Sequence, residues 1–269
     1  MPTVKVRIDK LLVERGLVIS RERAQALVLA GRVLVNDQKV EKPGTQIDSE
    51  AELRLLGEDL RYVSRGGLKL EAALENWELD LAGRIAMDVG ASTGGFTDCM
   101  LQHGAAQVIA IDTGYGQIAA RLRSDLRVKL LEKTNARYLT AEQVRQAGQA
   151  GPVSFIAIDV SFISVTLILP AILQAAFLAR HETKTASHGE PGAAAPPRHE
   201  LVVLIKPQFE VGRERVGKGG IVRDEQARQE AVEKVRRAVE ELGGRSIAIM
   251  DSPIRGAEGN REFLLYAEF

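Results

Sequence analysis

A lysine and an aspartate stand directly after two apolar runs of the kind that form buried strands. Asp159 follows Phe155-Ile156-Ala157-Ile158, and Lys206 follows Leu201-Val202-Val203-Leu204-Ile205. Each residue alone could simply mark the return of the chain to water. If the two strands are neighbours, however, both side chains lie at one edge of a sheet. A lysine at the mouth of an apolar cleft loses hydration, which lowers its pKa, so the pair predicts a base beside a carboxylate.

A glycine-rich turn lies earlier in the chain, in Asp88-Val89-Gly90-Ala91-Ser92-Thr93-Gly94-Gly95-Phe96. It follows the apolar run Ile85-Ala86-Met87 and precedes a segment that ends at His103-Gly104, which is the order of a strand, a turn and a helix. Glycine tolerates positive φ and, without a Cβ, lets a ligand approach the backbone at a helix N-terminus. We expect a nucleotide-like ligand to be bound by Asp88, Gly90, Ala91, Ser92, Gly94 and Gly95.

The spacing of these glycines narrows the choice of ligand. The dinucleotide fingerprint has glycine at its first, third and sixth positions, whereas here glycines fall at the first, fifth and sixth. Asp112 ends the next expected strand, 107–111, as Asp88 ends the first. Two carboxylates suit a cationic amino-acid head and a ribose diol, so we predict S-adenosylmethionine rather than a dinucleotide. Taken alone, the turn could also be only a tight connection.

Length and charge set outer limits on function. The chain has 269 residues, enough for one large domain or two unequal ones, and its formal net charge is zero. A uniformly basic nucleic-acid coat is thereby excluded, but a local basic face is not. The single cysteine, Cys99, allows no intrachain disulfide, and the first residues lack the apolar core of a signal peptide. We therefore expect a cytoplasmic protein.

The longest uncharged stretch, 162–179, approaches the length of a membrane span. It carries Ser164, Thr166, Pro170 and Gln174, and it directly follows the charged residue Asp159. We expect a buried helix packed on the sheet, with Ser164 as its N-cap, and no association with a membrane.

Residues 1–60 form a separate unit in this interpretation. Helices are expected in 7–16 and 20–31, followed by a hairpin at 33–40 that turns at Asn36-Asp37, and a strand in 51–55. Three stretches of this unit are similar to one known domain. They are Arg7-Ile8-Asp9-Lys10-Leu11-Leu12, Ser20-Arg21 with Ala24, and Gly31-Arg32-Val33-x-Val35-Asn36. Together they resemble the S4-like RNA-binding domain, a small α+β fold. The resemblance implies an RNA-facing surface.

Charge supports this surface, because nine basic residues stand against five acidic ones between Lys5 and Lys42. A merely solvated charged face is the alternative, since half of these basic residues have an acidic neighbour. The expected RNA-binding residues are Arg7, Lys10, Arg21, Arg23, Arg32 and Lys39, together with Arg65 in the junction.

A polar, glycine-bearing junction, 61–67, is expected to link this unit to a larger domain at 68–269. There, strands are predicted at 85–89, 108–111, 128–131, 155–158, 201–205, 246–250 and 263–267, with helices between most of them. Such alternation predicts an α/β fold with a largely parallel sheet and sites at the carboxyl ends of its strands. Residues 181–200 have a low-complexity composition, so we expect a disordered insertion. The histidines in or beside it, at 181, 188 and 199, lack accompanying acidic or cysteine ligands, and no metal site is predicted.

Several longer stretches are similar to one family. They are Val63-Ser64-Arg65-Gly66-Gly67-x-Lys69-Leu70, the glycine turn as far as Asp98, Asp159-Val160-Ser161-Phe162-Ile163-Ser164, Lys206-Pro207-Gln208-Phe209-Glu210 and Gly259-Asn260-x-Glu262-Phe263. Together they resemble the TlyA (haemolysin A) family, over the whole chain apart from the insertion. The resemblance implies a Rossmann-like S-adenosylmethionine-dependent methyltransferase sheet that acts on ribose 2′-hydroxyls of ribosomal RNA, on cytidine, in free RNA or in ribosomal subunits.

The same resemblance implies roles for single residues. The Lys-Asp-Lys-Glu tetrad of RNA ribose 2′-O-methyltransferases maps onto Lys69, Asp159, Lys206 and Glu262. Lys206 would be the base, Asp159 would lie beside the sulfonium, and Lys69 and Glu262 would orient the ribose. Asp112 would hold the cofactor ribose and Asn135 would contact adenine, with no metal required. The loop 209–223, which carries Arg213, Arg215 and Lys218, is expected to be a mobile lid over RNA.

Two alternatives stay open. The family name includes haemolysin, so a membrane-active protein is one of them, although no export signal or spanning helix supports it. An RNA-binding protein with an inactive methyltransferase domain is the other, against which stands the complete tetrad. The oligomeric state is not predicted.

Overall fold

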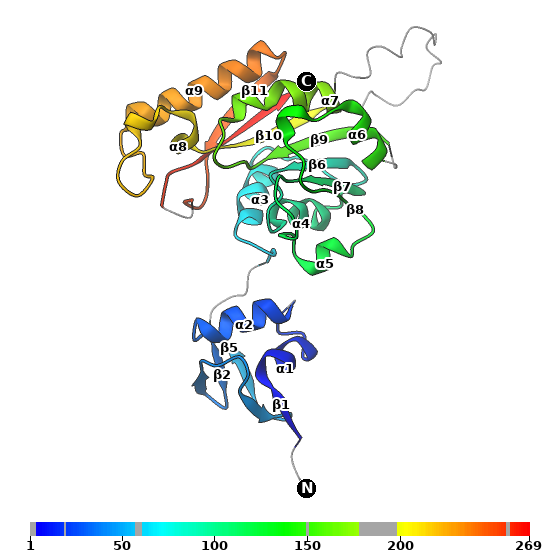
Figure 1. Cartoon of the computed structure of the whole chain (residues 1–269), viewed down its shortest axis with the longest axis vertical. Helices are drawn as coiled ribbons and strands as arrows, with labels where there is room; N and C mark the ends of the chain where they lie inside the picture. The colour runs from blue at the N-terminus through cyan, green and yellow to red at the C-terminus, as the bar shows by residue number, and fades with distance from the viewer. Residues whose placement is uncertain (1–3, 19, 57–60, 149–150, 178–197, 257–258) are drawn as a thin grey trace. The chain divides into compact units, whose positions relative to one another are not determined.

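The chain folds into two compact units, Met1–Arg61 and Tyr62–Phe269 (Figure 1). The computed structural model describes residues 4–18, 20–56, 61–148, 151–177, 198–256 and 259–269.

The N-terminal unit is a small α+β fold. Its elements are β1 (Lys5–Arg7), α1 (Ile8–Glu14), α2 (Arg21–Leu29), β2 (Val33–Val35), β3 (Gln38–Val40), β4 (Gln46–Asp48) and β5 (Leu53–Leu55). Strand β1 pairs with β4, and β2 lies between β3 and β5, in antiparallel pairs throughout. The core is formed by apolar faces of α1, α2 and β2, with Ile8, Leu12 and Val28 fully buried.

Local chemistry explains two boundaries in this unit. Helix α2 begins after Ser20, whose Oγ accepts a hydrogen bond from the backbone N–H of Arg23 at 3.2 Å, as predicted for an N-cap. The β2–β3 hairpin turns at Asn36 and Asp37, which have φ of 48° and 62°. These values belong to the two-residue turn that suits the twist of antiparallel strands, and asparagine and aspartate tolerate them better than most residues.

The C-terminal unit is built on a seven-stranded sheet. Its strands are β6 (Ile85–Val89), β7 (Gln107–Ile111), β8 (Val128–Leu131), β9 (Val153–Ile158), β10 (Glu200–Ile205), β11 (Arg245–Asp251) and β12 (Phe263–Glu268). Their order is β11-β12-β10-β9-β6-β7-β8. Strands β8, β7, β6, β9 and β10 are parallel, whereas β12 is antiparallel to both of its neighbours, β10 and β11. The seven predicted strands are confirmed, and the sheet is mixed only at this edge.

Helices cover both faces of the sheet. The regular helices are α3 (Gly66–Asn76), α4 (Gly95–Gln102), α5 (Ala120–Arg123), α6 (Ala141–Ala147), α7 (Leu169–Ala176), α8 (Pro207–Glu210) and α9 (Glu225–Glu241), with short 3-10 turns at Ala136–Tyr138, Val165–Leu167 and Arg213–Arg215. One apolar cluster joins the sheet to α3, α4 and α5. A second joins the other face to α6, α7 and α9. Because strands β8, β7, β6, β9 and β10 are parallel, their carboxyl ends lie along one edge of the sheet, where α8 directly follows β10.

Three segments differ from the prediction. Helix α3 begins at Gly66 rather than near residue 68, and Tyr62 is buried with its hydroxyl 2.9 Å from Glu71, so the junction 62–67 packs as part of the C-terminal unit. The predicted helix at 162–179 starts only at Leu169, because 162–168 forms a loop and a 3-10 turn, and Ser164 makes no side-chain cap there. Residues 181–197 of the predicted insertion lie outside the described residues, whereas His199 stacks on Phe177 and Glu200 begins β10.

Candidate active site

Asp159 and Lys206 form an ion pair where two neighbouring parallel strands end. Strand β9 ends at Ile158 and β10 at Ile205, and the two strands are hydrogen-bonded to each other. Lys206 Nζ lies 2.6 Å from Asp159 Oδ1 and donates a hydrogen bond to Ser161 Oγ at 2.8 Å. The lysine side chain is only 13% exposed, so this ammonium depends on protein partners more than on water. The sequence-based expectation that the two side chains meet is therefore confirmed.

A second ion pair joins segments far apart in the sequence. Lys69, from the first turns of α3, places Nζ 2.5 Å from Oε2 of Glu262, which directly precedes β12. The side chains are 10% and 2% exposed. A buried pair of this kind is electrically balanced only when both partners are present.

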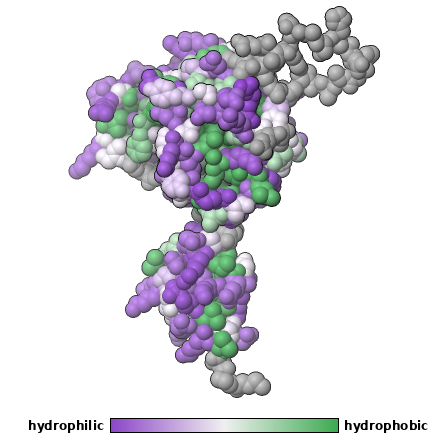
Figure 2. Space-filling model, turned by 45° about the vertical axis from the view of Figure 1, so that its right-hand side comes forward, coloured by the Kyte–Doolittle hydropathy of each residue, from purple (hydrophilic) through white to green (hydrophobic). Residues whose placement is uncertain are grey.

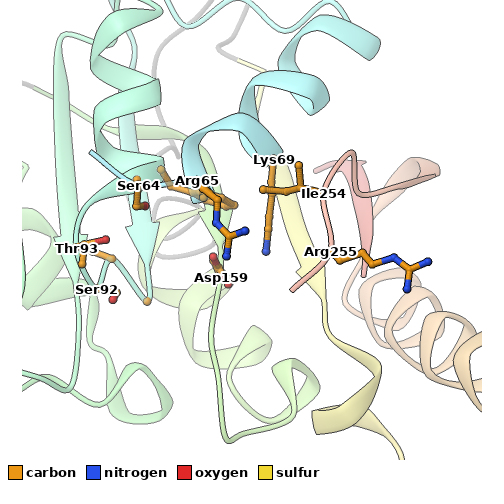
Figure 3. A pocket seen from close by; sticks show the side chains of 13 residues that line it. Ser64, Arg65, Lys69, Ser92, Thr93, Asp159, Ile254 and Arg255 are labelled. Carbon is orange, nitrogen blue, oxygen red and sulfur yellow. The ribbon is translucent and has the colours of Figure 1, made fainter. Parts of the chain in front are cut away.

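One member of each pair, Asp159 and Lys69, lines a hollow of about 250 Å³, named here the Lys69 hollow, whereas their partners Lys206 and Glu262 are not in its lining. Its lining includes Ser64, Arg65, Lys69, Gly90, Asp159 and Arg255. In Figure 3 the side chains of Arg65 and Lys69 extend toward Asp159, while Arg255 directs its guanidinium away from them. Arg255 was not predicted, because no pattern around Ile254 distinguishes a site from a loop. The lining therefore contains three cationic side chains and the carboxylate of Asp159.

The glycine turn packs closely against its neighbours because Gly90 and Gly94 have no Cβ. Gly90 has a φ of 90°, and a Cβ there would lie 2.3 Å from the carbonyl oxygen of Asp159. Gly94 has a φ of 95°, and a Cβ would meet Leu122 Cδ1 at 2.4 Å. Any other residue at these two positions would be strained and would displace its neighbours, so the turn requires glycine. Ser92, between them, also has a positive φ, 48°.

A second cavity, of about 430 Å³, opens on the other side of the turn and is named here the Asp112 cavity. It is lined by Gly90, Ser92, Asp112, Asn135 and Asp159 and by apolar side chains such as Ile111 and Ile168. Asp112 Oδ2 accepts a hydrogen bond from the N–H of Ser92 at 2.8 Å, and its Oδ1 accepts from the N–H of Gly114 at 2.7 Å. The amide oxygen of Asn135 accepts from the N–H of Arg137 at 3.0 Å. Asp112, Asn135 and Asp159 are thus gathered around one space.

Asp88 differs from the expectation that it contacts a ligand. The residue is completely buried and lines neither cavity; its Oδ2 accepts a hydrogen bond from Thr97 Oγ1 at 2.5 Å, and its Oδ1 has no hydrogen-bond partner. Burial raises the pKa of this carboxyl to about 7, although the bond from Thr97 acts in the opposite direction. Asp159 and Asp112 contribute a smaller increase by like-charge repulsion. Asp88 therefore supports the turn from beneath.

The predicted glycines of the turn divide between the two spaces. Gly90 and Ser92 line both of them, Ala91 and Gly95 line only the Lys69 hollow, and Gly94 is buried beside α5. Gly90, Ser92 and Asp159 therefore belong to the lining of both spaces.

In the N-terminal unit, Asp9 holds two of the predicted RNA-binding arginines. Asp9 is fully buried; its Oδ2 lies 2.8 Å from Nη2 of Arg7 and 3.0 Å from Nε of Arg21, and Gln25 donates to the same oxygen. Hydrogen bonding to Arg7 is the main reason why the pKa of Asp9 lies far below its usual value. The two guanidinium groups remain partly exposed and are fixed in place from below.

The remaining predicted basic residues of this unit are distributed differently. Lys10 is exposed, Arg32 donates Nε to the carbonyl of Leu56, and Lys39 lies 3.4 Å from Glu41. On the face seen in Figure 2, hydrophilic side chains cover most of the unit. The surface is therefore charged and polar, with some of its cations already paired.

Phe162 and Glu210 are notable residues that the sequence analysis did not single out. Phe162 is 92% exposed with a φ of 67°, which is unusual for an aromatic residue, and its ring lies 5.2 Å from that of Phe209. Glu210 is buried between the loops that follow β9 and β10. Both lie within stretches already noted for their resemblance, but no property of the residue types revealed these positions.

The predicted lid carries restraints. Arg215 pairs with Asp224 at 2.5 Å and also with Glu230. Asn260 is buried and fixes the loop through its side chain, with its oxygen accepting from the N–H of Val222 at 2.9 Å and its nitrogen donating to the carbonyl of Gly220 at 2.8 Å. The loop is thereby attached to the segment that carries Glu262.

Two further features concern the described part of the chain. No group of three or more histidine, cysteine, aspartate or glutamate residues is placed there to hold a metal ion. None of the helices described is both long and apolar enough to cross a membrane.

Comparison with known proteins matches both units. Residues 62–269 match the FtsJ-like methyltransferase family, and residues 6–53 match the S4 domain. The chain is 41% identical to the 16S/23S rRNA (cytidine-2′-O)-methyltransferase TlyA of Mycobacterium tuberculosis, over 97% of this chain and 89% of that protein. It is 36% identical to Hemolysin A of Brachyspira hyodysenteriae, over 97% and 99%. A solved structure of a hemolysin candidate from Streptococcus thermophilus has 42% identity and a TM-score of 0.67, over 99% of this chain and 89% of that one.

Proposed function

Because the chain belongs to the TlyA (haemolysin A) family of FtsJ-like methyltransferases, we propose that it methylates ribose 2′-hydroxyls of ribosomal RNA, on cytidine. The observation that carries this proposal is the meeting of two ion pairs from four separate segments at one edge of the sheet. Lys206 pairs with Asp159 and Lys69 pairs with Glu262, and one member of each pair, Asp159 and Lys69, lines the Lys69 hollow. This arrangement fits a reaction that requires a base and alignment, with no metal among its components.

The Asp112 cavity fits S-adenosylmethionine. Its carboxylates, Asp112 and Asp159, suit a ribose diol and a cationic centre, and the absence of a Cβ at Gly90 leaves room against the backbone. Asn135, in the same lining, is proposed to contact the adenine. When bound, S-adenosylmethionine supplies a methyl group that its sulfonium has already activated. Asp88 contributes through the turn above it rather than by contact.

Lys206 is the proposed base. A ribose 2′-hydroxyl is a poor nucleophile until its proton is removed, and Lys206 Nζ is the nitrogen that Asp159 and Ser161 hold at the strand ends. In this proposal Lys206 first releases a proton to solvent, and the neutral amine then accepts the proton from the 2′-oxygen, while Asp159 fixes the nitrogen in place. Lys69, held by Glu262, orients the ribose from the α3 side of the hollow.

RNA is the proposed macromolecular partner, as ribosomal RNA or as ribosomal subunits. The N-terminal unit offers Arg7 and Arg21, held by Asp9, and the exposed Lys10 for phosphate contact, with Arg23, Arg32 and Lys39 as further candidates. Arg65 and Arg255 line the Lys69 hollow and would contact phosphates next to the target ribose. We propose that the protein acts in the cytoplasm, where ribosomal RNA is available.

The decisive experiment is to map ribose methylation on ribosomal RNA from cells with and without this protein. The expected result is one or more cytidine 2′-O-methyl groups that disappear with the protein and return with the purified chain and S-adenosylmethionine. Unchanged methylation, together with no activity on RNA or subunits, would instead favour an RNA-binding protein with an inactive methyltransferase domain.

A further inference from the structure

Glu210 connects the two loops that carry the proposed base and its carboxylate. It lies four residues after Lys206, at the end of α8, and is buried. Its Oε1 accepts a hydrogen bond from the backbone N–H of Val165 at 2.7 Å, and its Oε2 accepts from Ser164 Oγ at 2.5 Å. Ser164 and Val165 belong to the loop that begins at Asp159. One carboxylate therefore joins the loop after β10 to the loop after β9.

A third element closes this arrangement. Lys234, from α9, places Nζ 3.3 Å from Glu210 Oε2, donates to the carbonyl of Glu210 at 2.9 Å and donates to Ser164 Oγ at 3.2 Å. The ammonium thus contacts both loops and supplies the charge that balances a buried carboxylate. Hydrogen bonds to charged groups are the stronger ones in proteins, so the three elements are held together firmly.

Neither Glu210 nor Lys234 is placed in the lining of the Lys69 hollow or of the Asp112 cavity. The cluster fixes the distance between the two loops. One loop carries Lys206 and the other carries Asp159, and their Nζ and Oδ1 atoms lie 2.6 Å apart. Small errors in the alignment of reacting groups reduce rates strongly, whereas binding depends less on them.

We propose that Glu210 is a positioning residue for methyl transfer, which aligns Lys206 with Asp159 by tying their loops together and to Lys234. This inference rests on the proposed function, because it assumes that Lys206 is the base. It goes beyond the tetrad, since Glu210 acts through Lys206 and not on the substrate.

Glu210→Gln tests the proposal with the smallest change of shape. The neutral amide keeps one oxygen for the N–H of Val165, but its NH₂ group now faces the ammonium of Lys234. The single-turnover methylation rate at saturating RNA and cofactor should fall about tenfold or more, while the RNA concentration for half-maximal rate changes less than about threefold. The change Lys234→Arg keeps a positive charge next to the Glu210 carboxylate, so this variant should keep most of the rate.

Glu200→Gln is the matched control. Glu200 is also a buried carboxylate, 5% exposed against 7% for Glu210, and it pairs with Arg84 at the opposite end of β10. Both variants should lose stability, measured by urea unfolding, but only Glu210→Gln should lose rate. Equal rates in the two variants would overturn the proposal.

A double-mutant cycle with Lys206 separates positioning from general damage. If Glu210 acts through Lys206, then adding Glu210→Gln to Lys206→Met should cause little further loss of the residual rate. Multiplied losses would show that Glu210 acts on something else and would overturn the proposal. A normal rate in Lys206→Met would overturn it as well, since there would be no base at that position to align.

A measurement without catalysis distinguishes failure of this inference from failure of the proposed function. Lys206 in the full chain can be acylated with acetic anhydride and its labelling followed by mass spectrometry. Loosening of the loops should change the labelling rate of Lys206 in Glu210→Gln severalfold, but not in Glu200→Gln. If the chain methylates no RNA and this change is still found, the proposed function fails and the positioning of Lys206 stands; an unchanged labelling rate rejects the positioning itself.

Discussion

The Lys69 ammonium lies 2.5 Å from the Glu262 carboxylate, although 193 residues separate the two in the sequence. Both side chains are almost completely buried, so each neutralises a charge that the interior could not otherwise accommodate. The pair also joins α3, next to the glycine turn, to the segment that precedes β12. Stability and activity should therefore respond differently to its removal.

Glu262→Gln should destabilise the C-terminal unit by roughly 3 kcal/mol, because it leaves a buried ammonium without its counter-charge. The double variant Lys69→Met with Glu262→Gln should recover most of that loss in urea unfolding, since no unpaired charge remains. Methylation should stay low in both variants if Lys69 orients the ribose. Recovery of the rate along with the stability would show that the pair is only structural.

Lys206→Met should remove turnover while keeping the fold. Methionine keeps the length of the side chain and removes the amine, so cofactor binding by calorimetry should be nearly unchanged. General-base catalysis contributes about a hundred- to ten-thousand-fold, and the single-turnover rate should fall within that range. Near-normal methylation would place the base elsewhere, and Lys69 would be the next residue to replace.

Asp112→Asn should weaken the binding of S-adenosylmethionine. The carboxylate accepts N–H groups of Ser92 and Gly114 and, in the proposal, the hydroxyls of the cofactor ribose. Loss of hydrogen bonds to a charged group is worth about 1.5–3 kcal/mol, or roughly a ten- to hundredfold increase in Kd. The control is Asp125→Asn, a loop carboxylate that pairs with Arg127 and lies outside the Asp112 cavity. Equal affinities in the two variants would contradict the assignment.

Lys10→Ala should reduce the salt dependence of RNA binding. Lys10 is exposed in the N-terminal unit, and one lost phosphate contact lowers the slope of log Kd against log salt by about 0.7–0.9. Arg54→Ala serves as the control, because Arg54 pairs with Asp37 at 2.6 Å and is not among the expected RNA-binding residues. Fluorescence anisotropy at several salt concentrations gives both slopes, and an unchanged slope for Lys10→Ala would remove Lys10 from the interface.

The sequence predicted the strands and the meeting of Asp159 with Lys206 because both follow from local patterns. Apolar runs mark buried strands, and parallel strands bring the residues after them to one edge. The family resemblance indicated Lys69 and Glu262 as site residues but did not predict that they pair, and neither the patterns nor the resemblance predicted the burial of Glu210. Contacts between distant loops depend on how helices and strands pack, which short patterns do not encode.

Asp88 shows the same limit in a different form. A carboxylate at the end of a strand next to a glycine turn was expected to contact the ligand, but the period-two alternation of β6 directs its side chain into the interior beneath the turn. The sequence identified the strand correctly, but the residue types do not show which way a single side chain points.

The burial of Asp88 predicts a pH dependence of stability. Its pKa is about 7 in the folded chain, where burial opposes ionisation, and 3.8 without that effect. Between these values the folded protein keeps a proton that the unfolded chain releases, so the free energy of unfolding should fall as pH rises from about 4 to 7. Below pH 4 both states are protonated, and above about pH 7 both are ionised, so the contribution is constant outside this window.

Asp88→Asn should flatten this part of the profile, because asparagine has no proton to release. The amide can still accept the hydrogen bond from Thr97, so the variant should fold. Between pH 5 and pH 7 the parent should lose roughly 2 kcal/mol of unfolding free energy that Asp88→Asn keeps. Urea unfolding at pH 5, 6 and 7 measures the difference. The control is Asp98→Asn, another buried carboxylate of the same unit, which is ion-paired with Arg121. If the parent and Asp88→Asn lose stability in parallel over this range, Asp88 is not the group that titrates.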